Sequence, residues 1–339
     1  MSFPRTRLRR LRSTPAMRDL VQEVRLHPSD LIQPYFVHDR DGDTPIDSLP
    51  NQSRLSIPSV CERSRTFYQN GGRAVLLFPV VDPALKDAFG GEAHNPHNLH
   101  ARAVAAVKAA VPDLVVMADV ALDPYTSHGH DGVLNAAGDV DNDATVQALV
   151  AQALVLARAG VDVIAPSDMM DGRIGALRAA LDDAGFSGVL LLSYTAKFAS
   201  HLYGPFRDAV GSGGVLRGDK KNYQMNPANA GEALREAAED IAESADMLMV
   251  KPATFYLDVL YRLSQSTTVP VLAYHVSGEY AMLHALAQQT GTPFAALYHE
   301  ALLSIKRAGA RGIVTYGAEG VCLAGIMGNT TPNVLTNNT

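Results

Sequence analysis

Two lysines end apolar runs, a position where lysine is uncommon. Lys251 ends the run ADMLMVK, and Lys197 ends the run LLLSYTAK. Burying an ammonium group is costly unless it is paired or loses its proton, and a neutral lysine amine is a nucleophile toward carbonyl carbons. One such lysine would be interpreted as a side chain that reaches the surface from a strand end. Two on consecutive strands would face each other across one pocket, where like-charge repulsion favours the neutral amine. The pair therefore predicts Schiff-base chemistry.

Further polar residues end or follow the other apolar runs. They are Asp119, Ser167, Asp168, Ser277 and Tyr316. Any one of them would be interpreted as a turn residue, because strand ends are commonly polar. Together with the two lysines they make seven polar groups, which predicts that they converge on one site.

Two long loops hold most of the remaining candidates. The loop over residues 119–132 contains three aspartates and two histidines without a cysteine, a set of ligands that suits magnesium better than zinc. A solvated, glycine-punctuated loop is the preferred alternative there. The loop over residues 201–221 is glycine-rich and basic with aromatic residues at one end, which is typical of a lid over an acidic substrate. In that loop Arg207 and Lys220 are candidates to clamp a carboxylate, and a mobile surface loop is the alternative.

A third loop, residues 274–280, opens a helix. Ser277 in this loop is either a helix N-cap or a ligand for a substrate carboxylate beside the exposed amides.

The elements that position these residues follow a regular alternation. Apolar runs predict strands at 31–37, 74–80, 114–120, 162–168, 189–194, 246–250, 269–275 and 312–316. Alanine-rich amphipathic segments predict helices between them, among them 99–110, 143–159, 175–184, 230–245, 279–289 and 294–308. Eight strands alternating with helices favour an α/β fold of the (β/α)8 TIM-barrel type, whose active sites lie at the C-terminal strand ends. A dinucleotide-binding fold lacks its GxGxxG fingerprint here.

Composition bounds the function classes. The chain has 339 residues, 47% hydrophobic and 19% charged, with a net charge of −6. The acidic balance argues against nucleic acid as a partner, and no apolar stretch reaches the length of about 20 residues that spans a bilayer. Two cysteines in no metal-ligand spacing suit the cytoplasm. We predict an N-terminal arm with subunit contacts at 1–30, a catalytic barrel at 31–330 and a C-terminal tail at 331–339.

Several motifs resemble one enzyme family. SYTAKFASHLYGPFRDA, GDKKNYQMNPAN, MLMVKPATFYLDV, APSDMMDGR, YHVSGEYAML and the opening FPRTRLRRLR together are similar to porphobilinogen synthase, also called 5-aminolevulinate dehydratase. The resemblance covers nearly the whole chain. It implies a homo-octamer assembled through the N-terminal arm, and condensation of two 5-aminolevulinate molecules to porphobilinogen with loss of two waters, a lyase step of tetrapyrrole (haem) biosynthesis.

The resemblance also implies roles for single residues. Lys251 would form the Schiff base with the substrate of the propionate side, and Lys197 with that of the acetate side. The other implied positions are Ser277 and Tyr316 for the propionate-side carboxylate, Arg207 and Lys220 for the other carboxylate, Asp119 and Ser167 near the substrate amino group, and Tyr203 and Phe206 in the lid.

The metal sites depart from part of the family. Zinc-dependent members carry three cysteines where this chain has Ala121, Asp123 and Asp131. The resemblance therefore implies the zinc-independent branch, in which allosteric magnesium binds at the position of Glu236, and no organic cofactor. Whether Asp123 and Asp131 bind a cation, or only water and substrate, is left open.

Two other functions remain as alternatives at this point. Another class I Schiff-base aldolase would need only one reactive lysine and usually a phosphate site, for which residues 316–320 offer few cations. A non-catalytic assembly or nucleic-acid-binding protein would use the arginines of the N-terminal arm.

Overall fold

The computed structural model describes residues 5–211, 216 and 218–323. The predicted C-terminal tail at 331–339 lies outside the described residues. The same is true of residues 1–4 of the predicted arm, 212–215 and 217 of the predicted lid, and 324–330 of the predicted barrel range.

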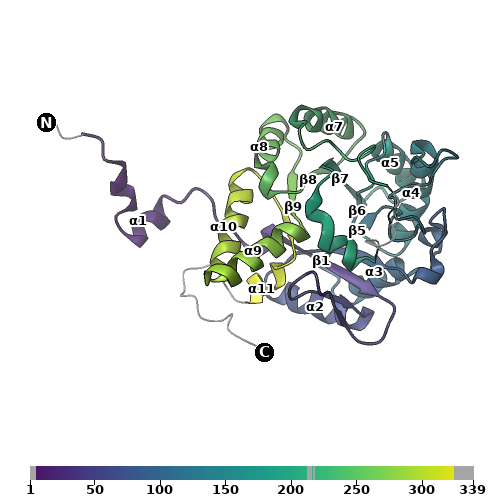
Figure 1. Cartoon of the computed structure of the whole chain (residues 1–339), viewed down its shortest axis with the longest axis horizontal. Helices are drawn as coiled ribbons and strands as arrows, with labels where there is room; N and C mark the ends of the chain where they lie inside the picture. The colour runs from purple at the N-terminus through teal and green to yellow at the C-terminus, as the bar shows by residue number, and fades with distance from the viewer. Residues whose placement is uncertain (1–4, 212–215, 217, 324–339) are drawn as a thin grey trace.

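Eight parallel strands close into a barrel, which confirms the predicted (β/α)8 fold (Figure 1). The ring closes because the first strand pairs with the last, Leu31 with Ile313 and Ile32 with Val314. Most strand residues are buried on both faces, as a parallel sheet covered by helices requires. The barrel strands are β1 (Leu31–His38), β4 (Ala74–Val80), β5 (Val115–Val120), β6 (Val163–Pro166), β7 (Leu190–Lys197), β8 (Met247–Lys251), β9 (Val271–His275) and β10 (Ile313–Thr315).

Helices surround this barrel and bury one side each. In one of them Ala233 and Ala237, a turn apart, are buried while Arg235 between them is exposed. The helices are α2 (Ile57–Gln69), α3 (Leu99–Ala110), α4 (Asn142–Arg158), α5 (Arg173–Asp183), α6 (Gly204–Ala209), α7 (Ala230–Ala242), α8 (Leu257–Ser266), α9 (Ser277–Thr290), α10 (Phe294–Arg307) and α11 (Ala318–Leu323). Within the described ranges, no helix is long and apolar enough to cross a membrane.

Strands β7 and β8 run further than the sequence predicts. Each ends at its lysine, and Lys197 pairs directly with Lys251 across the two strands. The predicted end at residue 194 is wrong because the pairing shifts register between Ser193 and Ala196 and then resumes. The lysines are therefore held by the sheet itself rather than by the loops that follow it.

A short hairpin, β2 (Thr44–Pro45) and β3 (Ser53–Leu55), extends the sheet beyond β1. The sequence analysis does not predict it, because its strands are too short and polar to produce an alternating pattern. The hairpin reaches the end of the barrel where the strands finish. Gln52 Nε2 donates to the Tyr316 carbonyl oxygen at 3.0 Å.

The N-terminal segment projects from the barrel (Figure 1). It contains a 3₁₀ turn at Leu8–Arg12 and α1 (Pro15–Leu20), and neither has a buried residue. Leu8 and Leu20 are 74% and 76% exposed. The predicted contact of this arm with another subunit stays a prediction.

Candidate active site

The two lysines lie side by side inside the barrel. Because Lys197 and Lys251 are direct partners in neighbouring parallel strands, their side chains point to the same face. They are 6% and 5% exposed. The strands thus bring together the pair that the sequence analysis singled out, although the surroundings of the two amines differ.

Aromatic rings surround the amine of Lys251. Burial, followed by the charge of Lys197, lowers the pKa of Lys251 to about 7. Rings attract a cation only weakly and supply no counter-charge, so they do little to oppose this effect. A large share of Lys251 is therefore neutral and nucleophilic near neutral pH. From Nζ to the ring centroids the distances are 4.3 Å for Tyr274, 5.0 Å for Phe206, 5.1 Å for Tyr194 and 5.4 Å for Tyr203.

Polar partners surround the amine of Lys197 instead. Its Nζ donates a hydrogen bond to the Ser167 carbonyl oxygen and lies 3.7 Å from Asp131 Oδ2. Ser167 directly follows β6, so the strand end that was predicted to supply a site residue contacts this lysine through its backbone. Lys197 therefore has a carboxylate beside it, whereas Lys251 lies among rings.

Three aspartates share this polar half of the site. Asp131 accepts from Lys220 Nζ at 2.9 Å, and Asp123 Oδ2 lies 3.4 Å from the same nitrogen. Burial opposes ionisation of Asp131, but the charges of Lys197 and Lys220 lower its pKa to about 2. Burial, with Lys220 opposing it, leaves the pKa of Asp123 above its ordinary value.

Asp119, the third aspartate, has a different protonation behaviour. Burial and the charge of Asp123 raise the pKa of Asp119 to about 7, against the opposing charges of Lys251 and Lys197. Its Oδ1 is buried without a hydrogen-bond partner among the described residues. A carboxyl group that titrates near neutral pH beside two amines can both accept and donate a proton.

The described residues offer no ready-made metal site. No group of three or more His, Cys, Asp or Glu side chains among them is arranged to hold a metal. In the loop whose aspartates were candidate cation ligands, Lys220 Nζ contacts both Asp123 and Asp131. The histidines there have partners too, since His128 Nε2 lies 3.1 Å from the Ala88 carbonyl oxygen and His130 Nδ1 lies 3.2 Å from Tyr223 Oη.

The predicted carboxylate ligands divide between the two lysines. Tyr316 Oη lies 3.1 Å from Tyr274 Oη, whose ring adjoins Lys251. Ser277, the first residue of α9, accepts from the Phe206 backbone N–H at 3.0 Å, also on the Lys251 side. Lys220 lies on the Lys197 side through Asp131.

Helix α6 belongs to the predicted lid, and this part of the lid covers Lys251. The Phe206 ring packs against the rings of Phe36 and Phe78 at 5.6 and 5.1 Å. Tyr203 Oη donates to the Lys251 carbonyl oxygen at 3.1 Å. Arg207 follows Phe206 on the same helix and is half-buried. Aromatic side chains thus separate Lys251 from solvent.

Arg54 of the β2–β3 hairpin holds the C-terminal end of α6. Its guanidinium donates to the carbonyl oxygens of Asp208 and Ala209, both at 2.8 Å. A cation at the last carbonyls of a helix satisfies acceptors that the helix leaves free. The hairpin that the sequence analysis missed therefore braces the helix that carries Phe206 and Arg207.

Asp168 differs from the other predicted site residues. It forms an ion pair with Arg173 of α5, 3.6 Å from Nε to Oδ2, and Arg173 also lies 3.6 Å from Asp240 of α7. Burial, which Arg173 opposes, raises the pKa of Asp168 to about 6. This pair was not predicted, and it joins the end of β6 to the surrounding helices.

Glu236 lies on α7 and is half-buried. It lines a cavity of about 400 Å³ together with Asp171 and Glu232. Burial, followed by the charge of Asp240, raises the pKa of Glu236. Neither active-site lysine lines this cavity, so Glu236 belongs to a second location.

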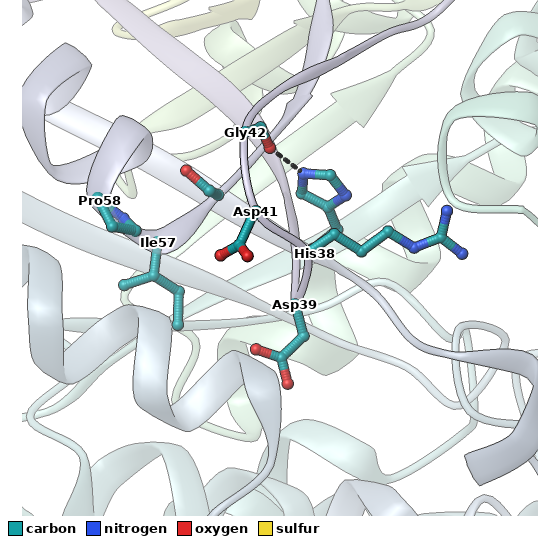
Figure 2. Close-up of a pocket in the computed structure, with 8 residues that line it drawn as sticks. His38, Asp39, Asp41, Gly42, Ile57 and Pro58 are labelled. Carbon is teal, nitrogen blue, oxygen red and sulfur yellow. Dashed lines mark hydrogen bonds between the residues drawn. The ribbon is translucent and has the colours of Figure 1, made fainter.

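A further cavity, of about 340 Å³, lies at the end of β1 (Figure 2). It is lined by residues 38–42 and 56–58, and His38 Nε2 lies 2.9 Å from the Gly42 carbonyl oxygen. Asp39, Arg40 and Asp41 are its charged residues. No lysine lines it among the described residues, so it has no amine for a Schiff base.

Comparison with known proteins agrees with this geometry. A family model for delta-aminolevulinic acid dehydratase matches residues 5–323. A delta-aminolevulinic acid dehydratase of Rhodobacter capsulatus is 48% identical, over 93% of this chain and 95% of its own length. One of Chlamydia pneumoniae is 49% identical, over 92% and 94%. The solved delta-aminolevulinic acid dehydratase (porphobilinogen synthase) of Toxoplasma gondii, in complex with the reaction product porphobilinogen, has a TM-score of 0.93 at 47% identity, covering 97% of this chain and 96% of its own.

Proposed function

The chain belongs to the delta-aminolevulinic acid dehydratase family, and we propose on this basis how its paired lysines condense two molecules of 5-aminolevulinate to porphobilinogen. It is an enzyme of this family, a lyase of porphyrin biosynthesis, and the reaction releases two waters. The observation that carries the proposal is the direct pairing of Lys197 with Lys251 on β7 and β8. A single-lysine aldolase or a nucleic-acid-binding assembly protein would not need that pair.

Lys251 forms the first imine in this proposal. Its neutral amine attacks the keto carbon of the propionate-side substrate, and the carbinolamine loses water to give the Schiff base. The lowered pKa of Lys251, about 7, supports this role because it supplies the free amine without an added base. Ser277 and Tyr316 hold the substrate carboxylate, and their positions on the Lys251 side support that assignment.

Lys197 forms the imine with the second, acetate-side substrate. Asp119, whose pKa is about 7 and which interacts with both amines, takes up the proton that Lys197 must lose before it attacks. Arg207 and Lys220 bind the carboxylate of this substrate. Lys220 then exchanges its contacts with Asp123 and Asp131 for the substrate, which leaves these two carboxylates free to bind water or substrate.

Asp119 carries protons between the substrates. Its pKa of about 7 supports this role, since the condensation must remove a proton from carbon and deliver protons to leaving water. Ser167 lies beside it and contacts the substrate amino group. The rings of Tyr203 and Phe206 exclude bulk water, which would otherwise hydrolyse the imines.

A magnesium ion would be held in the cavity on α7 and would activate the enzyme from there. Glu236, Asp171 and Glu232 line this cavity, and carboxylate oxygens with space for water suit a magnesium ion that keeps part of its hydration shell. Their mutual repulsion, part of what raises the pKa of Glu236, is relieved by a cation. Zinc is not required at the lysines, because the loop over 119–132 contains no cysteine that could supply a thiolate.

The enzyme assembles as a homo-octamer in the cytoplasm in this proposal. The projecting N-terminal segment, with Leu8 and Leu20 exposed, supports assembly because it offers apolar side chains that a second subunit would cover. Neither Cys61 nor Cys322 forms a disulfide, which supports a reducing compartment.

The proposal is tested by trapping and by product formation together. Incubation with 5-aminolevulinate and borohydride, followed by peptide mass mapping, should place a substrate adduct on Lys251. A colour assay for porphobilinogen should show turnover that rises with magnesium and is insensitive to a zinc-selective chelator. An unmodified Lys251 without product in a folded sample would refute the assignment. Loss of turnover on zinc removal would refute only its zinc-independent part.

A further inference from the structure

Glu279 is a buried carboxylate beside the active site that the mechanism above does not use. It lies in the first turn of α9 and is 1% exposed. Its Oε2 accepts from the Val276 backbone N–H at 2.7 Å and from that of Ala253 at 3.4 Å, while Oε1 accepts from the Thr254 N–H. One side chain therefore satisfies backbone amides from two separate segments.

The contact with Val276 is one half of a capping box, in which the third helical residue reaches back to the N-cap amide; the valine side chain cannot return a hydrogen bond. The contacts with Ala253 and Thr254 are not part of a capping box. These residues belong to the turn that directly follows Lys251, and α9 has no need of them. Burial also raises the pKa of Glu279 to about 7 despite the three amides. Burying a carboxylate costs free energy, and its contacts with the turn after Lys251 explain its presence better than the helix cap alone does.

The backbone of Lys251 is thus held on both sides. Its carbonyl oxygen accepts from the Phe198 N–H at 2.9 Å and from Tyr203 Oη at 3.1 Å. The two amides that follow Pro252 are held by Glu279.

The same helix start contacts the lid. Ser277 accepts from the Phe206 N–H at 3.0 Å, and a side chain at Gly278 would lie 2.5 Å from the Leu202 carbonyl oxygen. The start of α9 therefore touches the turn after Lys251, a proposed carboxylate ligand and α6.

We propose that Glu279 is a positioning residue for Lys251. It links the turn after this lysine to the start of α9 and so sets Nζ against the keto carbon of the substrate whose carboxylate Ser277 holds. This inference rests on the proposed function, because it concerns imine formation at Lys251. Glu279 itself touches no reacting atom. It acts by fixing the distance between the amine and the carboxylate site, to which reaction rates are sensitive.

The test replaces the carboxylate without changing its shape. In Glu279→Gln the amide NH₂ group must face at least one of the three backbone N–H groups, so at least one tie is lost. We expect imine trapping at Lys251, with 5-aminolevulinate and borohydride, to slow by about 10- to 100-fold. The kcat for porphobilinogen should fall by a similar factor, with a smaller change in KM. All rates are measured at a temperature well below the unfolding temperature of each variant, and circular dichroism shows that the variant is folded.

Glu243→Gln is the matched control. Glu243 also accepts from a backbone N–H of another element, Gly175 in the first turn of α5, at 2.9 Å, away from both lysines. It should trap substrate at the wild-type rate. Wild-type trapping in folded Glu279→Gln, or an equal slowing in both variants, would overturn the positioning role alone. Absence of an adduct on Lys251 in the wild-type enzyme would instead overturn the proposed function, and this inference with it.

Discussion

The charge of Lys197 should set part of the pH dependence of imine formation at Lys251. The relevant perturbation is Lys197→Met, which removes the charge and keeps an apolar side chain of similar length. With a pKa of about 7, about nine-tenths of Lys251 is neutral at pH 8, whereas an ordinary lysine would be about 0.3% neutral. The pKa of Lys251 is lowered first by burial and second by the charge of Lys197.

The size of the second contribution follows from the sheet. Neighbouring strands lie about 4.8 Å apart, and we take this spacing as the separation of the two amines. Two unit charges at that separation repel by about 3.5 kcal/mol at an effective dielectric constant of about 20. Asp131, 3.7 Å from Lys197 Nζ, cancels part of this repulsion. We therefore expect the pKa of Lys251 to rise by about one unit in Lys197→Met, which at pH 7 reduces the neutral fraction about fivefold.

The assay is the rate of borohydride trapping at Lys251 as a function of pH, read by peptide mass mapping. It reports the imine step even in a variant that makes no porphobilinogen. The midpoint should move to higher pH in Lys197→Met and stay near the wild-type value in Lys197→Arg, which keeps the charge. Identical midpoints in Lys197→Met and wild type would show that burial alone lowers the pKa of Lys251. That result would refute the contribution assigned to the charge of Lys197.

Three further results are expected. Lys251→Met should abolish product formation while circular dichroism stays unchanged; residual turnover would contradict its role. Arg54→Ala removes two hydrogen bonds from a charged donor to α6, worth about 1–3 kcal/mol. Tryptic cleavage after Arg207 should therefore accelerate and KM should rise. An unchanged cleavage rate would contradict the stabilisation of α6 by Arg54. Gly278→Ala places a methyl group 2.5 Å from a backbone oxygen and should lower the free energy of unfolding by about 1–3 kcal/mol, whereas Gly231→Ala, with open space around it, should not; equal effects would contradict the close packing.

The sequence predicts the barrel and the lysine pair because both are local signals. An apolar run and its terminal lysine lie within eight residues, and strand order follows from the alternation with helices. The aromatic rings around the Lys251 amine were not predictable in the same way. Tyr274 and Phe206 come from other elements, and aromatic residues of this type are common in any core. Such contacts depend on tertiary packing, which periodicity does not report.

The pairing of Lys220 with Asp131 illustrates the same limit. The sequence analysis treated Lys220 as a carboxylate clamp and Asp131 as a candidate cation ligand, in two separate loops. The residues are 89 positions apart, and only the fold brings the amine within 2.9 Å of the carboxylate. The β2–β3 hairpin was missed for a different reason, because strands of two and three residues carry no periodic signal.

Closure of the ring by β1 and β10 has a consequence for synthesis of the protein. The pairing partners Leu31 and Ile313 are separated by almost the whole chain. The ribosome must therefore synthesise all the residues between them before β1 can pair with β10. At about 5–20 residues per second, that interval is about 15–60 s. On that side β3 pairs with Phe36 and Val37, but Leu31 and Ile32 stay unpaired until β10 is made, which is a hazard for aggregation. We expect nascent chains that stop before β10 to bind chaperones, and chains released just after it to escape them.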